Sequence, residues 1–124
     1  KADRLNKTEE KARLLKSLER MFVQEAKTHK AVMDTAAPEA ERISAIRTVR
    51  NYTFHFHVDD YLSVIRDTNN PLEVRVVMAE ALGWFTNSVQ RPHILSELKA
   101  MQQSNALPEE LNAEIGQTIK RLSL

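Results

Sequence analysis

The amino-acid sequence predicts an all-helical protein, and three observations support this fold class. Only two glycines and four prolines occur among 124 residues, and most helix-forming residue types are abundant. Apolar residues recur every three or four positions over long segments, which is the spacing of one helix face. No segment has the pattern of a plausible strand. A chain of this length fits one domain, which would span residues 1–124.

The first helix is predicted between about residues 7 and 34. Asn6-Lys7-Thr8-Glu9 has the composition of a helix start, because Asn or Thr can accept hydrogen bonds from free amides and an acidic residue suits the positive end of the helix dipole. The apolar residues that follow form one broad stripe: Leu14, Leu15, Leu18, Met21, Phe22 and Val32. We expect this stripe to pack against the other helices, so that the first helix caps one end of the fold.

Five further helices are predicted, at about residues 38–52, 58–67, 71–85, 92–103 and 108–122. Proline marks most of their starts, because it suits the first helical turn and disfavours a helical residue before it. The helices are expected to pair into three hairpins, at about residues 7–52, 57–85 and 91–122.

Three of these helices form a repeat. Pro38, Pro71 and Pro108 each open a helix, and they are 33 and 37 residues apart. The first two copies share an aspartate four residues before the proline and an arginine four residues after it, namely Asp34 and Arg42, then Asp67 and Arg75. Periods in this range are typical of arrays of helical hairpins, in which one hairpin alone cannot bury its apolar face.

The middle copy, Leu62 to Gly83, resembles the HEAT family, especially the short bacterial HEAT-like repeats. An apolar helix ends in Asp67, a turn contains Pro71, Val74-Arg75 follows, and the second helix ends in Ala81-Leu82-Gly83. The first copy is looser, and the third lacks the Asp and the Arg, as expected of a terminal repeat that faces water. The resemblance implies an α-α superhelix, a short right-handed solenoid of three hairpins.

The resemblance also implies structural roles for the repeat residues. The Asp and Arg side chains would bridge the turn and the next repeat, the prolines would fix the turns, and the small residues would let neighbouring helices approach closely. These residues are Asp34, Pro38, Arg42, Asp67, Pro71, Arg75, Gly83 and Pro108.

Composition excludes several functional classes. Lys and Arg number 18 against 17 Asp and Glu, whereas dedicated nucleic-acid binders usually have a clear basic excess. No cysteine occurs, which excludes disulfides, thiol catalysis and Cys-based zinc sites and leaves the redox compartment open. No apolar run has the length of a membrane span and no signal peptide is visible, so we expect a soluble domain. Because the chain starts at Lys1, we expect it to be a processed or excised part of a longer protein.

The second helix of each hairpin is expected to line a concave side, with Trp84 as its sharpest candidate contact. Val77, Glu80, Ala81 and Trp84 share a helix face offset from the core stripe, and Trp near charged residues is typical of binding hot spots. The candidate contacts are Arg47, Asn51, Glu80, Trp84 and Arg121. The alternative is that Trp84 fills the gap between hairpins, which the usual burial of Trp favours.

His55-Phe56-His57 with Asp59 and Asp60 offers imidazole and carboxylate groups, which are metal ligands. Their spacing matches no strong motif, and capping of the next helix by His57 or Asp59 is the more expected role. His29 and His93 have no acid pattern around them in the sequence. We therefore expect no metal site and no cofactor.

No nucleophile elbow, phosphate loop or paired-carboxylate signature occurs, so we do not expect an enzyme. The first hypothesis is a protein-interaction or scaffold module with a protein partner. The alternatives are a nucleic-acid-binding or ligand-binding helical-repeat domain, and a structural spacer within a larger protein. The sequence leaves the partner, the compartment and the oligomeric state open.

Overall fold

The computed structural model describes residues 2–104 and 106–124, with side chains from residue 8 onward. These residues form six helices and no strand, which confirms the all-helical prediction. The helices are α1 (Ala2–Met33), α2 (Glu39–Tyr52), α3 (Val58–Arg66), α4 (Leu72–Leu82), α5 (Arg91–Gln103) and α6 (Glu109–Ser123).

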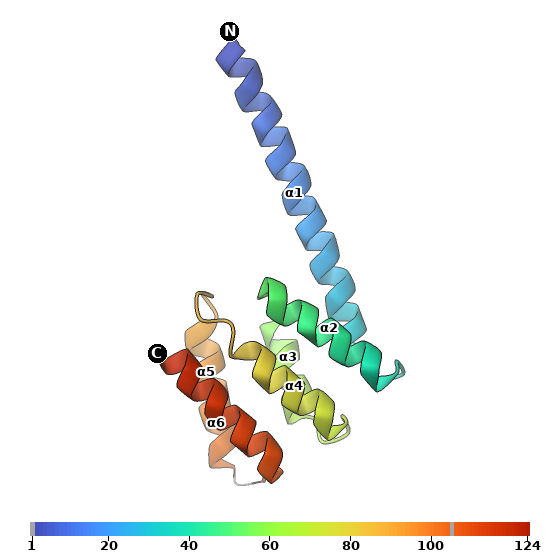
Figure 1. Ribbon diagram of the computed structural model, residues 1–124, viewed down its shortest axis with the longest axis vertical. Helices are drawn as coiled ribbons and strands as arrows, with labels where there is room; N and C mark the ends of the chain where they lie inside the picture. Colours follow the sequence, from blue (N-terminus) through green and yellow to red (C-terminus); the bar gives the residue numbers. More distant parts are fainter. Residues whose placement is uncertain (1, 105) are drawn as a thin grey trace.

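Consecutive helices pack in pairs, α1 with α2, α3 with α4, and α5 with α6. Helix α4 also contacts both α2 and α6, so that the second members of the three pairs are neighbours. Figure 1 shows α2, α4 and α6 side by side and running in the same direction, with α3 and α5 behind them. This arrangement places residues about one repeat apart in the sequence next to each other in space.

The three repeat prolines occupy the same backbone position. Pro38, Pro71 and Pro108 are the N-cap residues of α2, α4 and α6, each with φ near −55° and ψ between 141° and 146°. A proline has no backbone N–H that would be left unsatisfied at a helix start, and its ring fixes φ close to the observed value. Each proline is therefore the last residue of its turn, and the helix begins at the next residue.

One predicted helix start is wrong, and one predicted side-chain cap is absent. Helix α1 already runs at Ala2, so Asn6-Lys7-Thr8-Glu9 lies inside the helix. At α3 the N-cap residue is His57, but no side chain caps the helix, and the Asp59 carboxylate instead binds His93. Capping residues lower the cost of a helix start, but they do not impose one where helix-forming residues continue on both sides.

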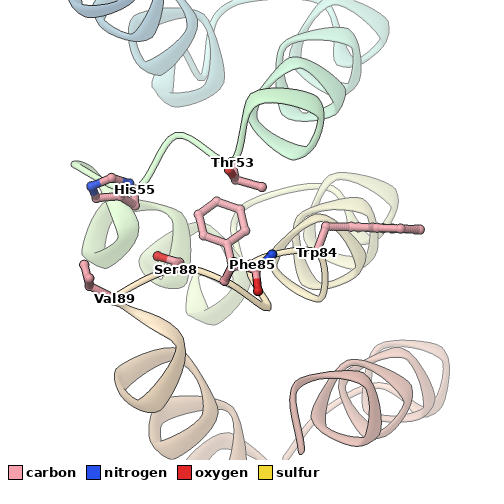
Figure 2. A pocket seen from close by; sticks show the side chains of 7 residues that line it. Thr53, His55, Trp84, Phe85, Ser88 and Val89 are labelled. Atoms are coloured by element: carbon pink, nitrogen blue, oxygen red, sulfur yellow. The ribbon is translucent and has the colours of Figure 1, made fainter. Parts of the chain in front are cut away.

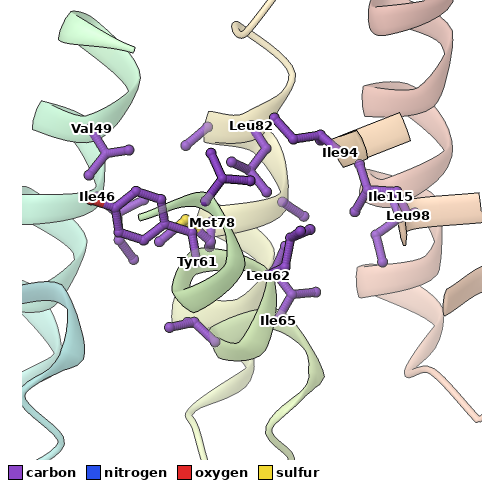
Figure 3. Close-up of a cluster of buried hydrophobic side chains, with 14 of the residues drawn as sticks. Ile46, Val49, Tyr61, Leu62, Ile65, Met78, Leu82, Ile94, Leu98 and Ile115 are labelled. Carbon is purple, nitrogen blue, oxygen red and sulfur yellow. The ribbon is translucent and has the colours of Figure 1, made fainter. Parts of the chain in front are cut away.

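Buried apolar side chains form one cluster that extends from α2 to α6 (Figure 3). Tyr61, Leu62 and Ile65 of α3 lie at its centre together with side chains of α4, between those of α2 on one side and those of α5 and α6 on the other. Among the described side chains of α1, Val32 is the one apolar side chain that is fully buried. The core therefore belongs to the five shorter helices and to the C-terminal end of α1.

The first two repeats share a set of buried hydrogen bonds. Arg42 Nε donates to the Val32 carbonyl at 3.0 Å, and Arg75 Nε donates to the Ile65 carbonyl at 2.7 Å. Both arginines are about 95% buried, and both carbonyls lie in the last turn of the preceding helix, where carbonyl groups lack helical partners. The arginine of each repeat thus ties the two helices of its own pair together.

A single asparagine links the first repeat to the second. Arg42 Nη1 donates to Asn70 Oδ1 at 3.1 Å, and Asn70 Nδ2 donates to the Val64 carbonyl at 3.1 Å. The aspartates have a more local role than the family pattern implies, because Asp34 and Asp67 each accept a backbone N–H two residues ahead in their own turns. At the turns that carry the repeat motif, the link between the two repeats is made by Arg42 and Asn70, and not by Asp34 or Asp67.

Helix α1 projects from the rest of the molecule (Figure 1). All residues from 8 to 24 are exposed, and burial begins at Glu25. Helix α1 has 32 residues and its partner α2 has 14, so at 1.5 Å per residue α2 can cover less than half of α1. The prediction that the apolar stripe packs against the other helices is therefore wrong for its residues from Leu14 to Phe22.

Candidate functional site

Trp84 lies two residues beyond the end of α4 and is 51% exposed. The prediction that favoured a buried Trp84 is therefore wrong. The helical path continues through Gly83 (φ −65°, ψ −13°), and this places Phe85, not Trp84, in the core, where Phe85 is fully buried. The sequence offers two adjacent aromatic residues, and the end of the helix decides which one faces water.

Trp84 is the centre of a cluster that joins three helices. The guanidinium carbon of Arg121 in α6 lies 5.0 Å from the Trp84 ring centroid, in a cation–π arrangement. The Trp84 Nε1 donates to Glu80 Oε1 at 3.4 Å, and Arg50 Nη1 of α2 donates to the same oxygen at 3.2 Å. We call Arg50, Glu80, Trp84 and Arg121 the Trp84 cluster.

The structure thus brings together Glu80, Trp84 and Arg121 of the five predicted contacts. Arg47 and Asn51 are exposed on α2, and Asn51 accepts a hydrogen bond from Arg50 Nε at 3.4 Å. Ala81, which was expected to share the face of Trp84, is buried.

Sequence reasoning missed Arg50, which connects α2 to the Trp84 cluster through Glu80. The two residues are 30 positions apart, close to the 33-residue repeat, so the repeat spacing is the signal that could have found the pair. A residue in the second helix of one pair lies opposite a residue in the second helix of the next pair. The two are about one repeat apart in the sequence, less one helical turn.

Glu114 of α6 adds a second carboxylate to this face. Burial raises the pKa of Glu114, the negative charge of Glu80 raises it further, and Arg121 partly lowers it. Acidic and basic groups therefore alternate across α2, α4 and α6, with an aromatic ring between them. Such a surface suits recognition of another macromolecule and contains no nucleophile with an activating base.

Gly83 sets how closely α6 approaches the end of α4. A Cβ atom at this position would lie 2.7 Å from Arg121 Nη1 and 3.3 Å from Thr118 Cγ2. Thr118 Oγ1 also donates to the Ala79 carbonyl at 2.8 Å, a direct bond between α6 and α4. The missing side chain at Gly83 leaves the space in which Arg121 reaches the Trp84 ring.

A cavity of about 350 Å³ lies beside the Trp84 cluster, between the α2–α3 and α4–α5 connections (Figure 2). Thr53 and His55 line one side, and Phe85, Ser88 and Val89 line the other. The Trp84 side chain extends away from these residues in Figure 2. The lining contains one titratable side chain, His55, so the cavity holds no acid–base pair.

A second exposed feature lies on α1. Leu14, Leu15, Leu18, Met21 and Phe22 share one side of this helix, and each is at least half exposed. We call these five residues the α1 stripe. The ring centroids of Phe22 and Phe56 lie 5.4 Å apart, so the exposed apolar surface continues from the stripe onto the α2–α3 connection. None of the described helices has the length and apolar content that a membrane span needs.

The four residues considered as metal ligands, His55, His57, Asp59 and Asp60, do not all converge on one point. His55 packs on the Phe56 ring at 4.6 Å, Asp59 binds His93 of α5 at 2.6 Å, and Asp60 binds His29 of α1 at 2.7 Å. His29 and His93, which have no acid pattern around them in the sequence, thus each have an aspartate partner from α3. Those partners are 31 and 34 residues away, again close to the repeat spacing.

Comparisons of the chain with protein-family models, curated proteins and solved structures give no match. The likeness to HEAT repeats therefore stays a prediction from the sequence motif.

Proposed function

We propose that this chain is a protein-interaction module, a short HEAT-like solenoid that presents α1 and the face around Trp84 to protein partners. The observation that carries the proposal is the α1 stripe. Its five large apolar side chains are each at least half exposed, on the part of α1 that projects from the other helices, and exposed apolar patches of this kind mark interaction sites.

The spacing of the α1 stripe favours a helical partner. Leu14, Leu18 and Met21 follow each other by four and three residues, and Leu15, Leu18 and Phe22 follow by three and four. This is the pattern of a seam at which a second helix packs. The opposite side of α1 carries Lys16, Arg20 and Lys27, which keeps that side in water.

The Trp84 cluster supports a second contact region on the face of α2, α4 and α6. Trp and Arg are the residue types most enriched at binding hot spots, and here they stack on each other while half of the Trp side chain stays exposed. If the pairs form a right-handed superhelix, as the family resemblance implies, this face would line its concave side.

The nucleic-acid alternative has weaker support. Glu80 and Glu114 lie on the same face as Arg50 and Arg121, and a phosphate backbone would meet both carboxylates. The near-zero net charge of the chain gives little long-range attraction to a polyanion.

The experiment compares the interactions of the wild-type chain with those of matched glutamine variants. Leu15→Gln with Leu18→Gln makes the α1 stripe polar at similar side-chain volume, and we expect at least a tenfold loss of binding, on the order of 1.4 kcal/mol. Val23→Gln is the control, because Val23 is 61% exposed but lies outside the stripe. Capture from a lysate identifies the partner, and sedimentation of the purified chain tests whether the partner is a second copy.

Equal binding by the double variant and the Val23→Gln control would contradict the role of the α1 stripe. Tight binding of duplex DNA with a steep dependence on salt concentration would instead favour the nucleic-acid alternative. Far-ultraviolet circular dichroism of each variant shows that the helices are intact.

A further inference from the structure

His29, His57 and Asp60 come together from three separate elements. His29 lies one turn before the end of α1, His57 is the N-cap residue of α3, and Asp60 lies in the first turn of α3. His29 Nε2 lies 2.7 Å from Asp60 Oδ2, and the His29 and His57 rings are nearly parallel with centroids 3.7 Å apart. One ligand atom from each residue can be chosen so that all three lie within 4.8 Å of one another.

Two imidazoles and one carboxylate are a donor set that Zn²⁺ and its neighbours in the first transition row prefer. Donor atoms on one tetrahedral zinc ion lie roughly 3.4 Å apart, because zinc–ligand distances are about 2.0–2.2 Å. To reach this spacing the ligand atoms must move closer together, and the nearly parallel rings of His29 and His57 must rotate so that a nitrogen lone pair of each points at the ion. The side chains of His29 and Asp60 are 24% and 51% exposed, so an ion can reach this cluster from solvent.

The surroundings hold the three donors in place. Glu25, one turn before His29 on α1, is buried and accepts the Phe56 backbone N–H at 3.0 Å. This bond fixes the segment that carries His57 against α1.

Helix α3 also contains an internal comparison. Asp59 binds His93 at 2.6 Å, just as Asp60 binds His29, but the metal-ligand geometry among the described residues includes only the set with His29, His57 and Asp60. A histidine–aspartate pair alone supplies two donors, whereas the second imidazole supplies the third that a protein-bound zinc ion normally requires.

We propose that His29, His57 and Asp60 bind a divalent transition-metal ion, with Zn²⁺ as the best match to the donors. Three protein ligands leave a fourth position open for water or for a side chain of a partner. The ion would join the C-terminal end of α1 to the start of α3, and this inference is independent of the partner proposed for the α1 stripe. It differs from the expectation of no metal site, because His29 and Asp60 are 31 residues apart in the sequence and meet only through the packing of their helices.

The test uses the purified chain after dialysis against EDTA. Calorimetric titration with Zn²⁺ should show one site per chain, and Co²⁺ should give the visible absorption of a tetrahedral ion. His57→Gln and Asp60→Asn should each weaken Zn²⁺ binding by more than the roughly 10–100-fold that loss of an outer-sphere partner causes. His93→Gln and Asp59→Asn change the comparison pair in the same way and should leave the affinity unchanged.

Thermal unfolding gives an independent readout that does not depend on the folding of any single variant. Zn²⁺ should raise the Tm of the wild-type chain and of the His93→Gln variant, but not that of the His57→Gln variant, because an ion that binds only the folded chain stabilises it. Absence of one-site binding by the wild-type chain would overturn the proposal. Equal affinity loss in the two sets of variants would overturn it as well.

Discussion

The two parts of α1 have opposite surroundings, although most of the large apolar side chains lie in the exposed part. Between residues 25 and 33, Glu25, Thr28 and Val32 are buried, and His29 binds Asp60 of α3. Between residues 8 and 24 every residue is exposed, including the five residues of the α1 stripe. Apolar periodicity identifies the face of a helix that is stabilised by burial. The length of the neighbouring helix, however, decides how much of that face the fold buries.

The largest expected difference in the free energy of unfolding is between a buried and an exposed leucine that are both replaced by alanine. Leu82 of α4 is fully buried and Leu18 of α1 is 50% exposed. We expect Leu82→Ala to lower the free energy of unfolding by about 3 kcal/mol, since truncation of a buried leucine leaves a cavity. Leu18→Ala should change it by less than about 0.5 kcal/mol. Urea denaturation of both variants measures the two values, and equal losses would mean that α1 is covered in solution.

The next comparison concerns two arginines. Arg75 is buried and donates to the Ile65 carbonyl, whereas Arg47 is exposed on α2. Arg75→Ala should cost about 2 kcal/mol, because it removes a charged donor and leaves a buried carbonyl unsatisfied. Arg47→Ala serves as the control and should be nearly neutral. A neutral Arg75→Ala would show that water replaces the arginine at this carbonyl.

Gly83→Ala tests how the array positions its exposed aromatic residue. The new methyl group would lie 2.7 Å from Arg121 Nη1, so the guanidinium must move away from Trp84. We expect a destabilisation of about 1 kcal/mol from overpacking, together with a changed fluorescence spectrum of Trp84, which is the single tryptophan of the chain. Arg121→Ala should change the spectrum in a similar way. An unchanged spectrum in Gly83→Ala would mean that Arg121 does not stack on the ring.

The smallest effect is expected at Glu114, where the pKa is raised by burial and by the charge of Glu80. A carboxyl group with a raised pKa in the folded state destabilises the fold when it is ionised, and this cost disappears below the pKa of the unfolded chain. Glu114→Gln should therefore raise the Tm at pH 7 by no more than about 2–3 °C and leave it unchanged near pH 4. A lower Tm at pH 7 would show that the attraction to Arg121 outweighs the other two effects.

The helical class and the approximate helix positions could be predicted because their signals are local. Prolines, turn residues and apolar spacing act within a few residues, and the three helices that follow Pro38, Pro71 and Pro108 begin at the next residue. The start of α1 was missed because Asn6 and Thr8 resemble capping residues although the helix passes through them. The α1 stripe was recognised, but its exposure depends on the length of α2.

The candidate sites were predicted less completely, because their residues come from neighbouring repeats. Glu80, Trp84 and Arg121 were expected on one surface, yet the contact with Arg50 depends on how α2 is displaced along α4. The pairing of His29 with Asp60 depends in the same way on the packing of α1 near α3. Such displacements follow from side-chain packing between helices, which helix periodicity does not encode.

The anchored end of α1 makes the exposed part of this helix a lever. From residue 8 to residue 24 a straight helix reaches about 25 Å, so a tilt of only about 10° at the anchor would displace its tip by about 4 Å. The torque from any load at the tip would fall on the contacts of Glu25, His29 and Val32. Arg42 donates hydrogen bonds both to the Val32 carbonyl and to Asn70. A force on α1 would therefore be transmitted through Arg42 to the turn that precedes α4.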